Sequence, residues 1–185
     1  MQGKLLSASE PMLEEWQEFS QNISKKKQLI DWLKCKARAK MTGADCLEKL
    51  TVAAPQYYGK LGIFITLKKG KSVRGCSGAF SHTSTDISAV LSDYLSGSLT
   101  RDPRYKPLEI SELERTEIIL TITSQPYAVA DAESVDVLRY GIALTCADGI
   151  TIVYVPTELR TSQSIQKQLK EKDCQISAFR AVTIK

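Results

Sequence analysis

The sequence predicts an α+β fold in which helices flank a mostly antiparallel sheet. Two observations carry this prediction: helix-period segments fill the first quarter of the chain, and most later strands are joined by short turns rather than by crossover helices. A third is the composition, 43% apolar and 25% charged over 185 residues, which is ordinary for a globular protein. We therefore expect one domain, residues 1–185, with a second, smaller lobe inserted or appended.

The first quarter predicts two helices. Ser9 can cap a helix that carries apolar residues from Met12 to Phe19. Ser24 can cap a longer one over residues 25–41, and residues 44–50 are expected to add a short helical turn. Residues 61–67 then form an apolar strand that is expected to be central in its sheet, and residues 72–80 return as its partner after a basic turn.

A third helix is expected to start at residues 81–85 and to end near Gly97, because its apolar residues recur at helical spacing. Residues 102–107 form a loop, since each of the two prolines disfavours α geometry in the preceding residue. Strands follow over 116–124, 140–146 and 150–155, with a hairpin turn at 147–149. A helix to about Lys172, capped by Thr161 or Ser162, and a last strand over 175–184 complete the chain.

Composition excludes several classes of site. His82 is the one histidine, so zinc sites built on histidine clusters are excluded, and neither a metal nor a cofactor is expected. Five cysteines occur without a C-x-x-C pair, no apolar run approaches a membrane span, and the first ten residues lack the apolar core of a signal peptide. We expect a cytoplasmic protein that does not enter a membrane.

The candidate nucleophile is Cys76, which lies between Gly75 and Gly78 in the second strand. Arg74 would face the same side of the strand and could stabilise a thiolate, while the glycines leave room for a substrate. The alternative is that Cys76 is a small buried residue and the glycines serve close packing. A Cys76–His82 dyad is the weaker of the catalytic options.

The second candidate is the proline-braced loop with Asp102, Arg104 and Tyr105. If Arg74 and Arg104 converge, they could clamp a carboxylate or a phosphate. Equally, Asp102 could cap a turn, Arg104 could pair with Asp102 or Glu109, and Tyr105 could pack on the core.

Basic residues form the third candidate. A cluster lies in the 25–41 helix and another in the 68–71 turn, whereas the net charge of the whole chain is a modest +4. The helix cluster comprises Lys25, Lys26, Lys27, Lys34, Lys36, Arg38 and Lys40. Such a set is typical of a solvated helix face, and its functional alternative is contact with nucleic acid or another polyanion, which must weaken with salt.

Four short segments occur in an order along the chain that resembles a known protein family. The strand 61–68, the segment Arg74-Gly-Cys-Ser-Gly78, the segment Asp102-Pro-Arg-Tyr105 with Pro107-Leu108, and Glu112-Leu113 resemble the AMMECR domain family (Alport syndrome, midface hypoplasia and elliptocytosis chromosomal region), the A component of the AmmeMemoRadiSam system. Ser77 stands where the family has isoleucine, and Tyr140 stands where it has a histidine. This chain is similar to a divergent member.

The resemblance implies a two-lobed α/β protein for which no reaction is established. It implies a Memo-like protein or a radical-SAM enzyme as partner, and it makes any activity that needs the family histidine doubtful at Tyr140. Two functions stay open: an anion-accommodating, thiol-dependent cleft lined by Arg74, Gly75, Cys76, Gly78, Asp102, Arg104 and Tyr105, or a non-enzymatic module that binds protein or nucleic acid.

Overall fold

The computed structural model describes residues 10–156, 158, 165–166, 169 and 173–185. Its contacts divide the chain into two compact units: Thr123–Ala181 form the second, and the remainder, including Val182–Lys185, forms the first. The second unit is thus an insertion in the first. The α+β class with an antiparallel sheet is confirmed, while the domain boundaries 1–185 stay a prediction.

Two helices open the first unit. Helix α1 spans Glu10–Gln21 and buries Leu13, Trp16 and Phe19. Helix α2 spans Ile23–Thr42, and its cap is Asn22 rather than the expected Ser24: the Asn22 side chain accepts a hydrogen bond from the Lys25 N–H at 3.0 Å. Helix α2 ends at Gly43, where a positive φ of 73° closes the last turn.

The sheet of the first unit is built on β1 (Gly62–Lys69), which lies between β2 (Ser72–Ala79) and β3 (Glu117–Thr123), and the end of β7 (Cys174–Ile184) follows β3. Strand β1 is therefore internal, as its apolar run predicts. Its residues Ile63, Ile65 and Leu67 are fully buried in the core that the helices cover.

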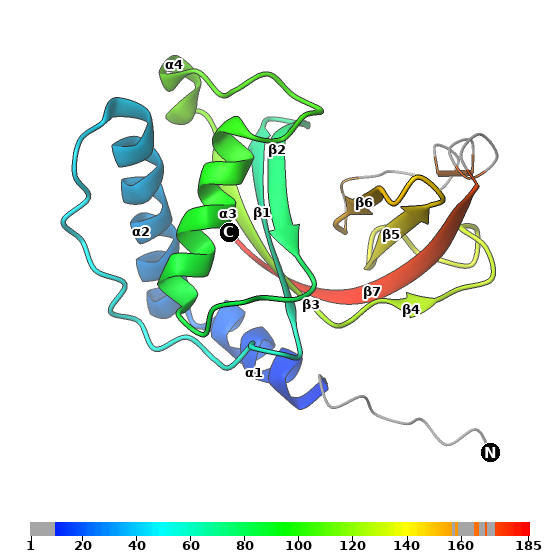
Figure 1. The fold of residues 1–185 in the computed structure, drawn as a ribbon. Coiled ribbons are helices and arrows are strands. Elements are labelled where there is room, and N and C mark those ends of the chain that lie inside the picture. Colours follow the sequence, from blue (N-terminus) through cyan, green and yellow to red (C-terminus); the bar gives the residue numbers. More distant parts are fainter. Residues whose placement is uncertain (1–9, 157, 159–164, 167–168, 170–172) are drawn as a thin grey trace. The chain divides into compact units, whose positions relative to one another are not determined.

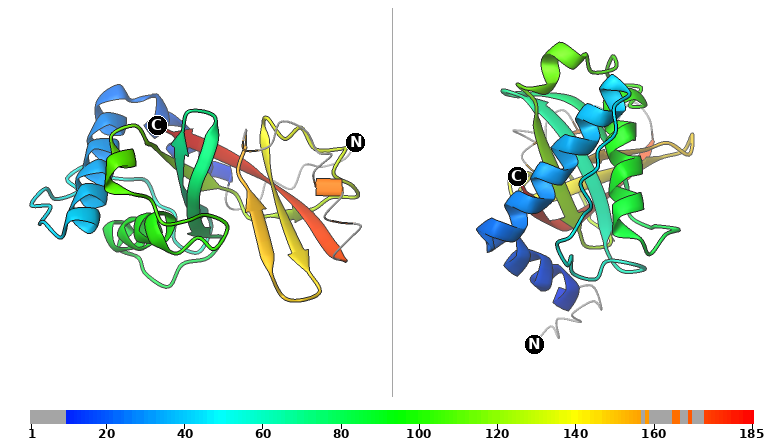
Figure 2. Two further views of the ribbon diagram at one scale, coloured as in Figure 1. Left: turned by 90° about the horizontal axis from the view of Figure 1, so that it is seen from above. Right: turned by 90° about the vertical axis from the view of Figure 1, so that its left-hand side faces the viewer.

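Helix α3 (Ile87–Thr100) lies across β1 and β2, and α2 lies beside α3 (Figures 1 and 2). The Asp86 side chain caps the start of α3 by accepting a hydrogen bond from the Ser88 N–H at 2.9 Å. Contrary to the sequence prediction, Gly97 does not end this helix but is buried inside it. A Cβ on Gly97 would lie 2.3 Å from Oγ of Ser77 on β2, so the glycine allows close helix-to-strand packing.

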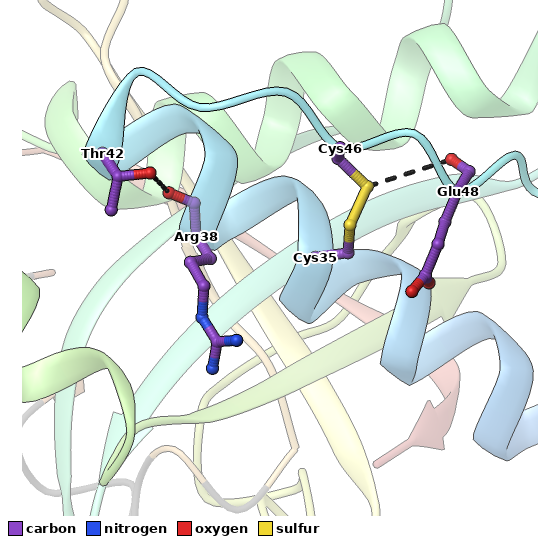
Figure 3. Close-up of a disulfide and its surroundings, with 5 residues drawn as sticks. All are labelled: Cys35, Arg38, Thr42, Cys46 and Glu48. Atoms are coloured by element: carbon purple, nitrogen blue, oxygen red, sulfur yellow. Dashed lines mark hydrogen bonds between the residues drawn. A yellow bond between two sulfur atoms is a disulfide. The ribbon is translucent and has the colours of Figure 1, made fainter.

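The segment that follows α2 is not helical and is linked to α2 by a disulfide bond. Residues 44–50 have no helical turn, which corrects the prediction for this segment. Cys46 forms a disulfide with Cys35 of α2, with the two Cα atoms 5.7 Å apart (Figure 3). The far end of the segment is held by the Trp16 indole N–H, which donates to the Gln56 carbonyl at 3.0 Å. Two anchors therefore replace regular secondary structure.

The second unit is a small antiparallel sheet with its own core. Strand β7 pairs with β4 (Tyr127–Ala128) on one side and with β5 (Tyr140–Cys146) on the other, and β5 pairs with β6 (Thr151–Tyr154). The expected hairpin at 147–149 joins β5 to β6, and Gly149 has a φ of 80°. Most of the helix expected before Lys172 falls outside the described residues.

Candidate functional site

Side chains of the motif residues in β2 alternate between the two faces of the strand. Gly75 and Ser77 face α3, so Cys76 and Gly78 point to the opposite face of the strand. The register of the strand pair shifts between Leu67 and Lys68, which leaves Arg74 as the extra residue of an irregularity, so alternation does not fix its side. Across the strand pair, Cys76 lies opposite Thr66 of β1, whose Oγ1 is 3.4 Å from the Cys76 Sγ. Cys76 is half-buried and belongs to neither disulfide.

The proline-braced loop meets strand β2 at Cys76. The Cys76 backbone N–H donates to Oδ2 of Asp102 at 2.8 Å. Arg104 donates to the same carboxylate through its backbone N–H (3.0 Å), Nε (3.1 Å) and Nη2 (3.0 Å). The Asp102 side chain is 4% exposed, and the Arg104 guanidinium lies 5.4 Å from the ring centroid of Tyr105. The motif segments thus form one hydrogen-bonded unit.

The charge of Asp102 is maintained by those bonds. Burial alone would raise the pKa of this carboxyl group, but the hydrogen bonds from Arg104 and from the Cys76 N–H outweigh burial and hold the pKa below its ordinary value. Asp102 is therefore ionised. Because β2 is the outermost strand of this sheet, the Asp102 carboxylate supplies the acceptor that the Cys76 N–H would otherwise lack at the sheet edge.

Arg74 is occupied elsewhere. Its Nε and Nη2 donate to the two carboxylate oxygens of Glu112 at 3.2 and 2.8 Å, and Lys69 donates to the same carboxylate at 3.0 Å. The expectation that Arg74 stabilises a Cys76 thiolate gains no support from this geometry. The clamp expected from Arg74 and Arg104 is also not formed, because each guanidinium already binds its own carboxylate, Glu112 and Asp102.

Glu112 is the residue that sequence reasoning missed as part of this site. It belongs to α4 (Ile110–Leu113), where its carboxylate also accepts the Glu109 N–H at 3.2 Å as one half of a capping box. The signal was present: Glu112 follows Glu109 by three residues, which is the spacing of that box. Hydrogen bonds from Arg74 and then Lys69 lower the pKa of Glu112 to about 2.

This pKa predicts an acid-sensitive contribution to stability. The folded state holds the Glu112 pKa below that of the unfolded chain, so the stabilisation is complete above about pH 4.3 and is lost as the pH falls toward about 2. Glu112→Gln is expected to lower the denaturation midpoint at neutral pH and to flatten its decline across this window. Urea titrations followed by tryptophan fluorescence measure both.

The control is Glu114→Gln, since Glu114 is an exposed residue that pairs with Arg38. It is expected to keep the decline of the unaltered protein. An unchanged decline in Glu112→Gln would contradict the assignment.

The two motif glycines are packed against protein. A Cβ on Gly75 would lie 2.0 Å from the backbone oxygen of Ser98 in α3, and a Cβ on Gly78 would lie 2.2 Å from the backbone oxygen of Ile63. The space that the substrate hypothesis reserves for a ligand is therefore filled, and the close-packing alternative describes both positions.

His82 takes no part in a dyad with Cys76. Its Nε2 lies 3.0 Å from the Leu61 carbonyl oxygen and its Nδ1 lies 2.9 Å from the Tyr94 hydroxyl. Because a carbonyl can only accept, Nε2 carries the proton and Nδ1 accepts from Tyr94. Burial lowers the pKa of this imidazole, which favours the neutral form that both bonds require.

The remaining cysteines differ from expectation. Cys146 and Cys174 lie directly opposite each other on β5 and β7 and form a second disulfide. Two disulfides are not what a reducing compartment favours, so the cytoplasmic location stays a prediction. Among the described residues, three or more potential metal-ligating side chains nowhere come together, and no helix is both long and apolar enough to cross a bilayer.

Basic residues of α2 are partly neutralised. Lys27 pairs with Asp31, Arg38 pairs with Glu114, and Lys36 lies over the ring of Trp32. Lys69 of the second basic cluster pairs with Glu112. In the second unit, Tyr140 is half-buried at the start of β5 opposite Arg180.

Comparison with known proteins agrees with the motifs. The AMMECR1 family model matches residues 14–181. Similar proteins include one from Thermotoga maritima, 32% identical over 84 residues (45% of this chain and 48% of that protein), and one from Methanococcoides burtonii, 36% identical over 89 residues (48% and 41%). The chain spans about half the length of these relatives.

A solved structure supports the fold. The crystal structure of an uncharacterized protein from Pyrococcus horikoshii matches with a TM-score of 0.60 over 91% of this chain and 90% of that one. The two sequences are 16% identical, so the match speaks for the fold alone.

Proposed function

Because the chain belongs to the AMMECR1 family, we propose that it is a protein-binding accessory component of a modification system and not itself a thiol enzyme. The observation that carries the proposal is the internal pairing of the motif. Arg74 is bonded to Glu112, and Asp102 is bonded to Cys76 and Arg104. Groups bonded in this way cost little further entropy when a partner docks, which favours a rigid recognition surface.

The surface in question comprises Arg74, Cys76, Arg104 and Tyr105. The side chains of Arg74 and Arg104 are 23% and 34% exposed, and Cys76 and Tyr105 are half-buried. An arginine stacked beside a tyrosine is a common anchor in protein interfaces. The family resemblance points to a Memo-like protein or a radical-SAM enzyme as the partner.

Direct binding tests this proposal. The purified chain is mixed with a Memo-like protein, and separately with a radical-SAM protein, from a genome that encodes all three, and association is measured by calorimetry. We expect a complex with at least one of them, weakened about tenfold or more by Tyr105→Ala. Lys49→Gln, an exposed control outside this surface, is expected to bind normally. Absence of a complex with both proteins would overturn the proposal.

A thiol-dependent reaction is the second candidate, and the partial exposure of Cys76 outside both disulfides favours it. Iodoacetamide labelling of the folded protein near neutral pH separates the two, with Cys76→Ala as the blank. Labelling slower than that of glutathione is expected for the accessory role. Faster labelling would indicate an activated thiol and would favour the enzymatic candidate.

A further inference from the structure

A cationic groove lies in the first unit, and its lining includes none of the four residues of the motif surface. It has a volume of about 440 Å³ and runs between α2, the connection from α4 to β3, and the end of the chain at Lys185. Ile30, Leu113 and Ile118 are buried and contribute the apolar part of its lining. Lys34, Arg38, Arg115 and Lys185 contribute the positive charges.

The groove is well fixed. Ile30, Lys34 and Arg38 follow one another at intervals of four and therefore form one stripe of α2. On the other side, the Arg115 and Thr116 N–H groups donate to the Glu112 and Leu113 carbonyls at 3.0 Å. The ion pair from Arg38 to Glu114 joins the two sides. Its cations are thus presented by ordered backbone, which lowers the entropic cost of binding.

The charge balance of the groove favours an anion. Glu114 is bonded to Arg38, whereas Lys34, Arg115 and Lys185 are exposed and form no ion pair within the part of the chain that the structure describes. Glu117 is the other carboxylate in the lining. Four cationic side chains therefore face two carboxylate side chains, one of them already bonded. Because Lys185 also carries the terminal carboxylate, the excess of positive charge comes from Lys34 and Arg115.

We propose that this groove binds an acidic peptide segment, whose carboxylates pair with Lys34 and Arg115 while its apolar atoms contact the floor. A nucleic acid fits less well for two reasons. Among the residues that the structure describes, none in the lining of the groove is an aromatic residue on which a base could stack, and Glu114 and Glu117 would repel a continuous row of phosphates. Separate carboxylates on a peptide can avoid those two positions.

The test uses fluorescein-labelled hexaglutamate and measures anisotropy at low salt. The double variant Lys34→Gln/Arg115→Gln is expected to bind about tenfold or more weakly. The control Lys49→Gln/Lys106→Gln removes the same charge from exposed lysines that do not line the groove. It is expected to keep most of the affinity. Circular dichroism confirms that both variants are folded.

Three results would overturn the proposal. The first is absence of hexaglutamate binding, and the second is an equal loss in both double variants, which indicates attraction by net charge alone. The third is a single-stranded RNA oligonucleotide that binds more tightly than the peptide and depends on Lys34 and Arg115, which would make the groove a nucleic-acid site. None of these outcomes bears on the motif surface, so the accessory role is tested independently.

Discussion

Gly75→Ala is expected to lower the free energy of unfolding by about 3 kcal/mol or more, a cost at the upper end of that for overpacked cores. Its Cβ would lie 2.0 Å from the backbone oxygen of Ser98 and 3.0 Å from the carbonyl carbon. Ser98 lies in the last turn of α3, and its backbone cannot retreat without moving this end of the helix away from β1 and β2. Urea unfolding monitored by fluorescence and by circular dichroism measures the change.

Gly97→Ala is the matched comparison, because its clash is with a side chain. Here the Cβ would lie 2.3 Å from Oγ and 2.7 Å from Cβ of Ser77. Adding Ser77→Gly removes both atoms, so the double variant is expected to regain a large part of the stability lost by Gly97→Ala. Ser98→Ala should give no such rescue to Gly75→Ala, since the clashing oxygen belongs to the backbone. Equal rescue in both pairs, or a Gly75→Ala protein as stable as the unaltered one, would contradict this packing.

Much of the first unit follows from local pattern. The apolar run of β1 is long enough to require burial on both faces, and helical spacing located α2 and α3. The end of α3 was predicted wrongly because glycine near the end of a helical pattern usually marks a cap. At Gly97 the reason for glycine is instead Ser77, a residue twenty positions earlier whose proximity depends on the tertiary fold.

In the candidate site, too, some contacts could be predicted from the sequence and others depend on the tertiary fold. Proximity of Cys76 to Asp102 could be anticipated from the resemblance, because both belong to its motifs. The partner of Arg74 could not be derived from strand alternation, which predicts Arg74 and Cys76 on one face of a regular strand but anticipates neither the register shift at Arg74 nor its bond to Glu112, 38 residues away. Disulfide pairing was likewise beyond local reasoning: Cys146 and Cys174 meet because β5 and β7 align in register across 28 residues.

Asp102→Ala is the second large expected effect, a loss of about 1–3 kcal/mol in the free energy of unfolding, as when a buried hydrogen-bond acceptor is removed from its donor. The carboxylate is 4% exposed and accepts bonds from the Cys76 N–H and from Arg104. Without it, the outermost strand of the sheet leaves the Cys76 N–H without this acceptor, and the Arg104 guanidinium loses its counter-charge. Thermal unfolding gives the loss in stability.

Hydrogen exchange separates this local role from general destabilisation. We expect the Cys76 amide to exchange faster in Asp102→Ala even under conditions where amides of β1 keep their protection. Asp102→Asn is the conservative control: its amide oxygen can still accept the Cys76 N–H, but its NH₂ group cannot accept from Arg104, so an intermediate loss of stability is expected. Unchanged exchange at Cys76 in Asp102→Ala would show that the loop does not hold the strand, and the rigid surface proposed for partner binding would then lose its physical basis.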